Sequence, residues 1–173
     1  MIGCVEYDKD LKKIGSFDVG EKNFAYCVGD VEEIDRWCHH DVVKKKKQNI
    51  TDSCLAISEI LEHENWLDCE EIVIEQQMRY NVRAQRVGQH IWTWFHCKYP
   101  HIPVKFVKSS LKSKYFEFPK NKNDSDLKKW AVEKARAILK TRKDEKNLRL
   151  LDEHAKRDDL ADSFLQLLAH LEY

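Results

Sequence analysis

The sequence predicts an α/β fold with a mixed five-stranded sheet, in which three antiparallel strands come first, parallel strands follow, and helices flank the sheet. Two observations predict this fold. Short apolar segments separated by glycine-containing breaks fill the first part of the chain, and such breaks suit tight hairpins. Further along, apolar segments of strand length alternate with longer segments whose apolar residues recur at helical spacing, which is typical of parallel strands joined by helices.

The antiparallel part of the sheet is predicted at residues 12–18, 24–29 and 31–37. The breaks between these segments lie at Gly20 and at residues 29 and 30, and both are short enough for hairpin turns. The three strands should therefore form an antiparallel meander. The lysine-rich segment 39–48 that follows is expected to be a solvated connection.

The rest of the chain alternates helices with strands. Helices are predicted at residues 50–65, 82–99, 124–140 and from about 157 to 172, and strands at 71–75 and 104–107. Cys54, Ile57 and Leu61 share one face of the first helix, whereas the strand at 71–75 is apolar on both faces, as in a central parallel strand. The charged segments 109–123 and 142–152 are expected to be a loop and a connection.

Composition limits the class of protein. A length of 173 residues with 42% apolar content fits one globular domain, and no repeat or linker divides the chain, so residues 1–173 are expected to form a single domain. Lys and Arg balance Asp and Glu at 30 each, so net charge excludes no partner. No apolar run approaches the ~20 residues that span a bilayer, and no signal-peptide pattern is present. Six scattered cysteines without a CxxC pair suggest reduced thiols and an intracellular protein that is not secreted.

An acidic cluster opens the last predicted helix. Asp158, Asp159 and Asp162 lie within five residues, and residues three or four apart share a helix face. Carboxylates held that close repel one another unless a divalent cation neutralises them. Acids at a helix N-terminus also complement the helix dipole, so this segment alone fits either a capped, solvated helix start or a metal site.

Two further acids lie at the ends of predicted strands. Asp18 ends the first strand, and Glu75 ends the first strand that follows a helix. If these strands pair in parallel through a right-handed crossover, the two carboxylates meet at one edge of the sheet. With Asp159 and Asp162 they would form a four-carboxylate set. Such a set suits Mg²⁺ or Mn²⁺ and can hold two ions roughly 3.5–4 Å apart for phosphodiester hydrolysis.

Three segments together resemble the motifs of a known family. They are SFDVGEKNFA at residues 16–25, IEQQ at 74–77 and KRDDLADSF at 156–164. In this order they are similar to motifs of the Holliday junction resolvases of poxviruses and other large DNA viruses, relatives of bacterial RuvC and of the fungal mitochondrial resolvases. The resemblance spans about residues 14–168. It implies an RNase H-like fold, a homodimer, and Mg²⁺- or Mn²⁺-dependent cleavage of four-way DNA junctions.

The resemblance also implies roles for individual residues. The metal ligands would be Asp18, Glu75, Asp159 and Asp162, with Asp158 as a less certain fifth. Family members carry a catalytic or phosphate-binding lysine before the third helix, where this chain has Lys128 and Lys129, and we favour Lys129 as the catalytic residue. The chain departs from the family in having Phe17 where an aliphatic residue is usual, and in lacking a proline near Ser109.

Basic residues near the acids are candidates for contact with DNA. Arg79, Arg83 and Arg86 follow Glu75 and could neutralise phosphates, although an ordinary basic helix face is the alternative. Further candidates are Lys108, Lys112, Lys114 and Lys128. Aromatic residues at 115, 116 and 118 are interleaved with these lysines, and they could either stack on an opened base step or anchor the loop to the core.

The predicted function is therefore that of a metal-dependent endodeoxyribonuclease that makes paired symmetric nicks in four-way junctions. One ion would polarise the attacking water, and the second ion, with Lys129, would neutralise the charge that develops on the phosphate. The expected partners are branched DNA and a second copy of the chain, in the host cytoplasm or nucleus, with no membrane and no small-molecule cofactor. The alternatives are an RNase H-like nuclease that acts on flaps, branched ends or RNA–DNA hybrids, and a junction-binding scaffold without catalysis.

Overall fold

A computed structural model gives the fold of the chain, and it describes residues 11–42, 49–118 and 123–173. The sheet has five strands in the order β3-β2-β1-β4-β5. They are β1 (Ile14–Val19), β2 (Asn23–Gly29), β3 (Ile34–Asp41), β4 (Glu71–Gln76) and β5 (Val104–Lys108). The pairs β1–β2 and β2–β3 are antiparallel, whereas β4 is parallel to both β1 and β5, which confirms the predicted mixed sheet.

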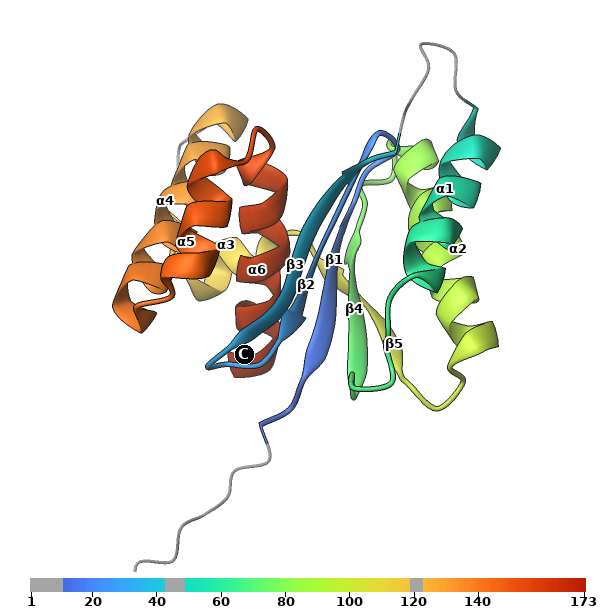
Figure 1. The fold of residues 1–173 in the computed structure, drawn as a ribbon. Helices are drawn as coiled ribbons and strands as arrows, with labels where there is room; N and C mark the ends of the chain where they lie inside the picture. Colours follow the sequence, from blue (N-terminus) through green and yellow to red (C-terminus); the bar gives the residue numbers. More distant parts are fainter. Residues whose placement is uncertain (1–10, 43–48, 119–122) are drawn as a thin grey trace, which may run out of the picture.

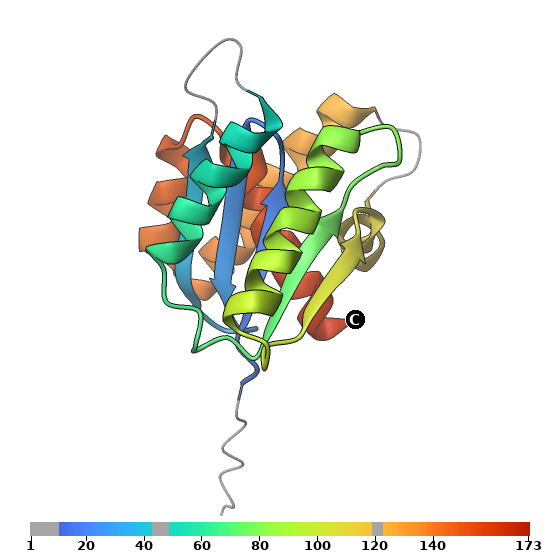
Figure 2. The same cartoon turned by 90° about the vertical axis from the view of Figure 1, so that its right-hand side faces the viewer.

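Helices cover both faces of this sheet, as Figures 1 and 2 show. One face carries α1 (Ile50–Glu62) and α2 (Val82–Lys98). The other carries α3 (Ser110–Tyr115), α4 (Asp124–Arg142), α5 (Glu145–Glu153) and α6 (Arg157–Glu172), with α6 lying directly on β1, β2 and β3. Among the described residues, no helix is both long and apolar enough to cross a membrane.

The core beneath α1 and α2 is aromatic. Phe17 of β1 lies at its centre, with its ring 5.3 to 5.8 Å from the rings of Phe24, Tyr26, Trp66 and Phe95. All five of these residues are fully buried. The aromatic residue at position 17, unusual for the resembled family, is therefore accommodated by other aromatic residues around it. It points away from the face that carries α6.

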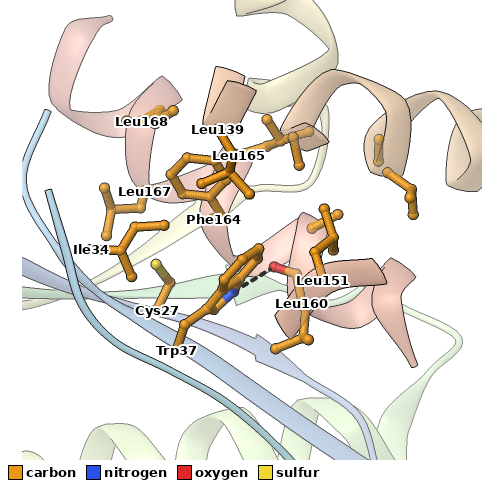
Figure 3. Close-up of a cluster of buried hydrophobic side chains, with 14 of the residues drawn as sticks. Cys27, Ile34, Trp37, Leu139, Leu151, Leu160, Phe164, Leu165, Leu167 and Leu168 are labelled. Atoms are coloured by element: carbon orange, nitrogen blue, oxygen red, sulfur yellow. Dashed lines mark hydrogen bonds between the residues drawn. The ribbon is translucent and has the colours of Figure 1, made fainter. Parts of the chain in front are cut away.

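The core beneath α6 fixes the position of that helix. The indole Nε1 of Trp37 donates to the carbonyl of Leu160 at 2.9 Å and to Ser163 Oγ at 3.2 Å, while its ring packs on Phe164 (Figure 3). The buried Gln166 Nε2 donates to Ser16 Oγ at 3.0 Å and to the carbonyl of Phe17 at 3.1 Å. These bonds hold α6 against β1 in one register.

The third strand differs from its prediction. β3 begins at Ile34, because Asp30 Oδ1 accepts the backbone N–H groups of Glu32 and Glu33 and closes a turn there. It then continues to Asp41, paired with β2 along its whole length, so the predicted connection is wrong for residues 39–41. Its later residues, 43–48, lie outside the described ranges.

Two segments predicted without regular structure are helical. α3 lies within the expected loop 109–123, and α5 begins within the expected connection 142–152 and ends one residue beyond it. α5 begins after Asp144, whose side chain accepts the backbone N–H of Asn147, and it buries Leu151 against α6. Both helices are short and lie in charged segments, which favours a loop or connection in the sequence, although the apolar residues of α5 gather on one face.

Candidate active site

Four of the predicted acids line one pocket. Asp18 comes from the end of β1, Glu75 from the end of β4, and Asp159 and Asp162 from the start of α6. The cavity has a volume of about 500 Å³, and Gln76, Gln77, Asn81 and Ser109 are also among its lining residues. We call it the carboxylate pocket. The structure therefore brings together the strand-end acids and two acids of the helix, as the sequence predicts.

Strand pairing and helix docking explain this convergence. β1 and β4 are parallel, with Phe17 opposite Ile74, so the next residue on each strand is Asp18 or Glu75. Figure 1 shows both strands ending at the upper end of the molecule, where α6 begins. Gln166 of α6 donates hydrogen bonds to Ser16 and Phe17, the two residues that precede Asp18. These bonds anchor α6 next to that acid.

The pocket concentrates negative charge. Burial raises the pKa of Asp18 well above its usual value, and the nearby charges of Glu75 and Asp162 raise it further. Burial also raises the pKa of Asp159, with a further contribution from Asp158. These carboxyls therefore resist ionisation in the absence of an added cation, which is the behaviour expected of a site that needs positive charge.

Lys112 of α3 brings a positive charge to two acids of the pocket, although it is not among the lining residues. Its Nζ lies 2.8 Å from Asp162 Oδ1 and 3.6 Å from Glu75 Oε2, and the side chain is only 7% exposed. Burial alone would lower the pKa of this lysine, but attraction to Asp162, Glu75 and Asp18 outweighs it and raises the pKa. Sequence analysis grouped Lys112 with surface lysines for DNA contact. Because α3 was not predicted, nothing in the sequence placed this residue among the acids.

Asp158 faces away from the pocket. It accepts a hydrogen bond from Lys128 Nζ at 2.9 Å and lines a neighbouring cavity of about 310 Å³ between α4 and α6. Burial alone would raise the pKa of Asp158, but the bond from Lys128 outweighs it and lowers the pKa. Lys128 lines both cavities, whereas Lys129, the predicted catalytic lysine, lines only the neighbouring one.

A histidine also reaches the site. His39 of β3 places Nε2 3.3 Å from Asp159 Oδ2, and its side chain is buried beneath the ring of His154, 5.0 Å away. Burial lowers the pKa of His39, with a smaller contribution from His154, so the imidazole is neutral at neutral pH. The contact between His39 and Asp159 could not be predicted from the sequence, because the predicted strand ends before His39.

The residues predicted to contact DNA differ in their exposure and in their ion pairs. Arg79 and Arg86 are exposed, and Arg79 lines a cavity of about 260 Å³ beside Glu75. Arg83 forms an ion pair with Glu21 at 2.5 Å, which joins α2 to the β1–β2 turn. Lys108 and Lys114 are exposed at the end of β5 and in α3.

The aromatic residues among those lysines mainly anchor their segment. Tyr115 donates to Glu172, and Phe116 packs against the core beneath α6. Phe118 lies edge-on to Trp130, with ring centroids 5.0 Å apart. These contacts favour the anchoring alternative over base stacking.

The donor chemistry of the carboxylate pocket fits a hard divalent cation. Four carboxylates are the ligands that Mg²⁺ prefers, and buried Asp159 Oδ2 has no well-formed hydrogen bond among the described residues, although His39 Nε2 lies 3.3 Å away. Within the same described ranges, however, no three His, Cys, Asp or Glu side chains converge as a ready ligand set. The four carboxylates fit a divalent ion by their chemistry. In this structure, however, Glu75 and Asp162 are oriented toward the ammonium of Lys112.

The strand order, the two helical layers and the acids at the ends of β1 and β4 define a RuvC-like RNase H fold. The structure of RuvC from Thermus thermophilus superposes with a TM-score of 0.64 over 91% of this chain and 92% of that protein, at 14% identity. The complex of T. thermophilus RuvC with a Holliday junction substrate gives a TM-score of 0.60 over 92% of each chain, at 18% identity. At these identities the likeness establishes the fold.

Sequence comparison identifies distant viral relatives. Uncharacterized protein 170L of Invertebrate iridescent virus 6 is 26% identical over 223 aligned residues, covering 95% of this chain and 90% of that protein. Uncharacterized protein 97L of Invertebrate iridescent virus 3 is 29% identical over 105 residues, covering 61% of this chain and 49% of that protein. The chain thus matches about half of the length of protein 97L. No family model matches the chain.

Proposed function

We propose that this chain is a Holliday junction resolvase, a metal-dependent endodeoxyribonuclease that makes paired nicks in four-way DNA junctions. The observation that carries the proposal is the convergence of Asp18, Glu75, Asp159 and Asp162 in one pocket of a RuvC-like fold. A RuvC of this fold has been captured with a Holliday junction substrate, and the relatives described above are proteins of iridescent viruses.

Asp18, Glu75, Asp159 and Asp162 are the residues that would hold Mg²⁺ or Mn²⁺, in a site with room for two ions. A bound ion would supply polarisation of water and stabilisation of the leaving oxygen. The chain itself binds and orients the scissile strand. Lys128 is partly exposed at the boundary of the carboxylate pocket, where it can neutralise a phosphate, and this position favours it over Lys129 for that role.

Two copies of the chain, related by a twofold axis, would place two such pockets on symmetric strands of one junction. In this proposal, residues 1–173 act as one nuclease domain inside the infected cell, in the host cytoplasm or nucleus. Arg79 and Arg86 would contact backbone phosphates near the cleaved bond, since both are exposed and Arg79 lines a cavity together with Glu75.

The test compares cleavage of a mobile four-way junction, a flap and an RNA–DNA hybrid in Mg²⁺ by the wild type, Asp162→Asn and Asp158→Asn. We expect two symmetric nicks in the junction by the wild type. Asp162→Asn should lose at least ~10²-fold in single-turnover rate, because one carboxylate of the pocket is gone. Asp158→Asn should stay within ~10-fold of the wild type, because Asp158 faces Lys128.

Each alternative has its own signature in this test. Preferred cleavage of the flap or hybrid would replace the junction as the substrate. Junction binding without any metal-dependent cleavage would indicate a scaffold. Equal loss of rate in both variants would return Asp158 to the set of metal ligands.

A further inference from the structure

Lys112 occupies a position that neither its sequence context nor the proposed mechanism requires. We propose that its ammonium is the resident counter-cation of the carboxylate pocket in the DNA-free protein, where it keeps the pocket from binding its full complement of divalent ions until a DNA phosphate draws it away. The inference deepens the proposed function, on which the DNA-triggered release depends. The exclusion of metal by Lys112 is inferred from the geometry of the pocket alone.

The contacts of Lys112 are those of a bridging cation. Its Nζ lies between Asp162 of α6 and Glu75 of β4, at 2.8 and 3.6 Å from their carboxylate oxygens. An ammonium has only donors, so it uses the same carboxylate lone pairs that a divalent cation needs. The two cations cannot share these oxygens without strong repulsion, because the side chain is buried and solvent screens the charges little.

The orientations of the acids agree with this role. The four carboxylates line one pocket, yet among the described residues no three of them converge as a ligand set for an ion. Two of the four are instead directed at one ammonium group. Occupation of the whole site by metal therefore requires Lys112 to move. If Lys112 stays, only part of the site is available to metal.

The structure also allows Lys112 to leave. α3 is a single short helix, and the side chain of Ser109 makes no capping bond at its start. Ser109 itself lines the carboxylate pocket, so the start of α3 borders the place where a phosphodiester would lie. A phosphate there would offer anionic oxygens to the ammonium. The carboxylates would then be released for the second ion.

The first experiment measures Mn²⁺ binding to the DNA-free, full-length protein by isothermal titration calorimetry. Lys112→Met removes the charge but keeps the length of the side chain, and Lys112→Arg keeps the charge. Lys114→Met is the matched control, because Lys114 is exposed on the same helix. We expect Lys112→Met to bind Mn²⁺ at least ~10-fold more tightly, or to take up an additional ion, while the other two variants resemble the wild type. Binding by folded Lys112→Met that matches the wild type in both affinity and number of ions would overturn the proposal.

A second measurement uses only the wild type, so that it remains decisive if Lys112→Met does not fold. In NMR spectra of the lysine side chains, Mg²⁺ should shift the ε-methylene signal of Lys112 more than that of Lys114. An unchanged Lys112 signal while two ions occupy the pocket would refute competition between the ammonium and the metal.

The DNA-triggered release is tested by adding a phosphorothioate four-way junction to the wild type. We expect Mn²⁺ uptake to rise to the level of DNA-free Lys112→Met. A gain in the variant without a gain on adding the junction would keep the counter-cation role, refute release by this DNA, and count against a junction as the substrate. Failure of the inference and failure of the proposed function are thus distinguishable.

Discussion

At the scale of single residues, Glu71 shows how this chain handles a buried charge away from the pocket. It lies at the start of β4, with its side chain 1% exposed, and contacts Lys12, Lys105 and His170. Burial alone would raise the pKa of Glu71, but the hydrogen bonds from Lys105 and Lys12 outweigh it and lower the pKa to about 2. The ionised form is thus stabilised in the folded state.

This environment predicts a pH-dependent contribution to stability. Because the folded-state pKa of Glu71 lies below its ordinary value of 4.5, its contribution is present above pH 4.5 and is lost as the pH falls toward 2. Glu71→Gln should lower the free energy of unfolding by ~1–3 kcal/mol at pH 7 and by much less near pH 2.5. Urea denaturation of both proteins across this range measures the difference. An equal deficit at both pH values would contradict the assignment.

At the scale of elements, the docking of α6 on β1 sets the geometry of the pocket. Gln166 forms the only buried side-chain amide bridge described between these two elements, through Ser16 and the carbonyl of Phe17. Asp162 and Asp159 lie about one and two turns earlier on α6, and Asp18 follows Phe17 directly. A change at Gln166 should therefore shift Asp159 and Asp162, because all three residues lie on α6.

We expect Gln166→Leu to destabilise the protein by ~1–3 kcal/mol, because it leaves buried polar groups on β1 without a donor. It should also weaken Mn²⁺ binding several-fold, since α6 loses its register on β1. Ser163→Ala is the control. It removes a buried hydroxyl that contacts Trp37 and Leu160 on the side of β3, so it should cost stability with little effect on Mn²⁺ affinity. Equal effects of both variants on Mn²⁺ affinity would refute the specific role of Gln166.

The elements that the sequence predicted share a strong apolar period. The five strands and the helices α1, α2, α4 and α6 were all expected near their observed positions. α3 and α5 were missed because they are only six and nine residues long and lie in charged segments, even though the apolar residues of α5 share one face. The extension of β3 was missed because His39 and His40 look like solvated residues, whereas β2 pairs with them through its backbone.

At the scale of the whole molecule, some features of the candidate site could be predicted from the sequence and others depend on packing. Asp18 and Glu75 could be brought together on paper, since parallel strands end at one edge of a sheet. The position of Lys112 depends on the direction of α3, and the orientation of Asp158 depends on packing between α4 and α6. Neither is encoded in spacing along the chain, so neither was predictable.

The arrangement of charge over the molecule also predicts how it binds DNA. The net charge is zero, so attraction to phosphates must come from local groups such as Arg79 and Arg86. Each arginine that contacts a phosphate should contribute about one unit to the slope of log affinity against log salt. Arg79→Ala and Arg86→Ala should each make that slope shallower for a four-way junction in Ca²⁺, as measured by fluorescence anisotropy.

Glu21→Gln provides the converse variant. It removes the anion that pairs with Arg83, so we expect junction binding to tighten and the slope to steepen. Unchanged slopes in all three variants would place the DNA on another face of the molecule.

The distribution of the acids along the chain has a consequence for synthesis. Asp18 and Glu75 are translated early, but the pocket that joins them is completed only when α6, the last described element, docks on β1. A chain in which α6 has not yet docked therefore holds only two of the four acids of the pocket. If the proposed function is correct, hydrolytic competence would appear in one late event, after the sheet has formed, and a chain without α6 should not cleave DNA.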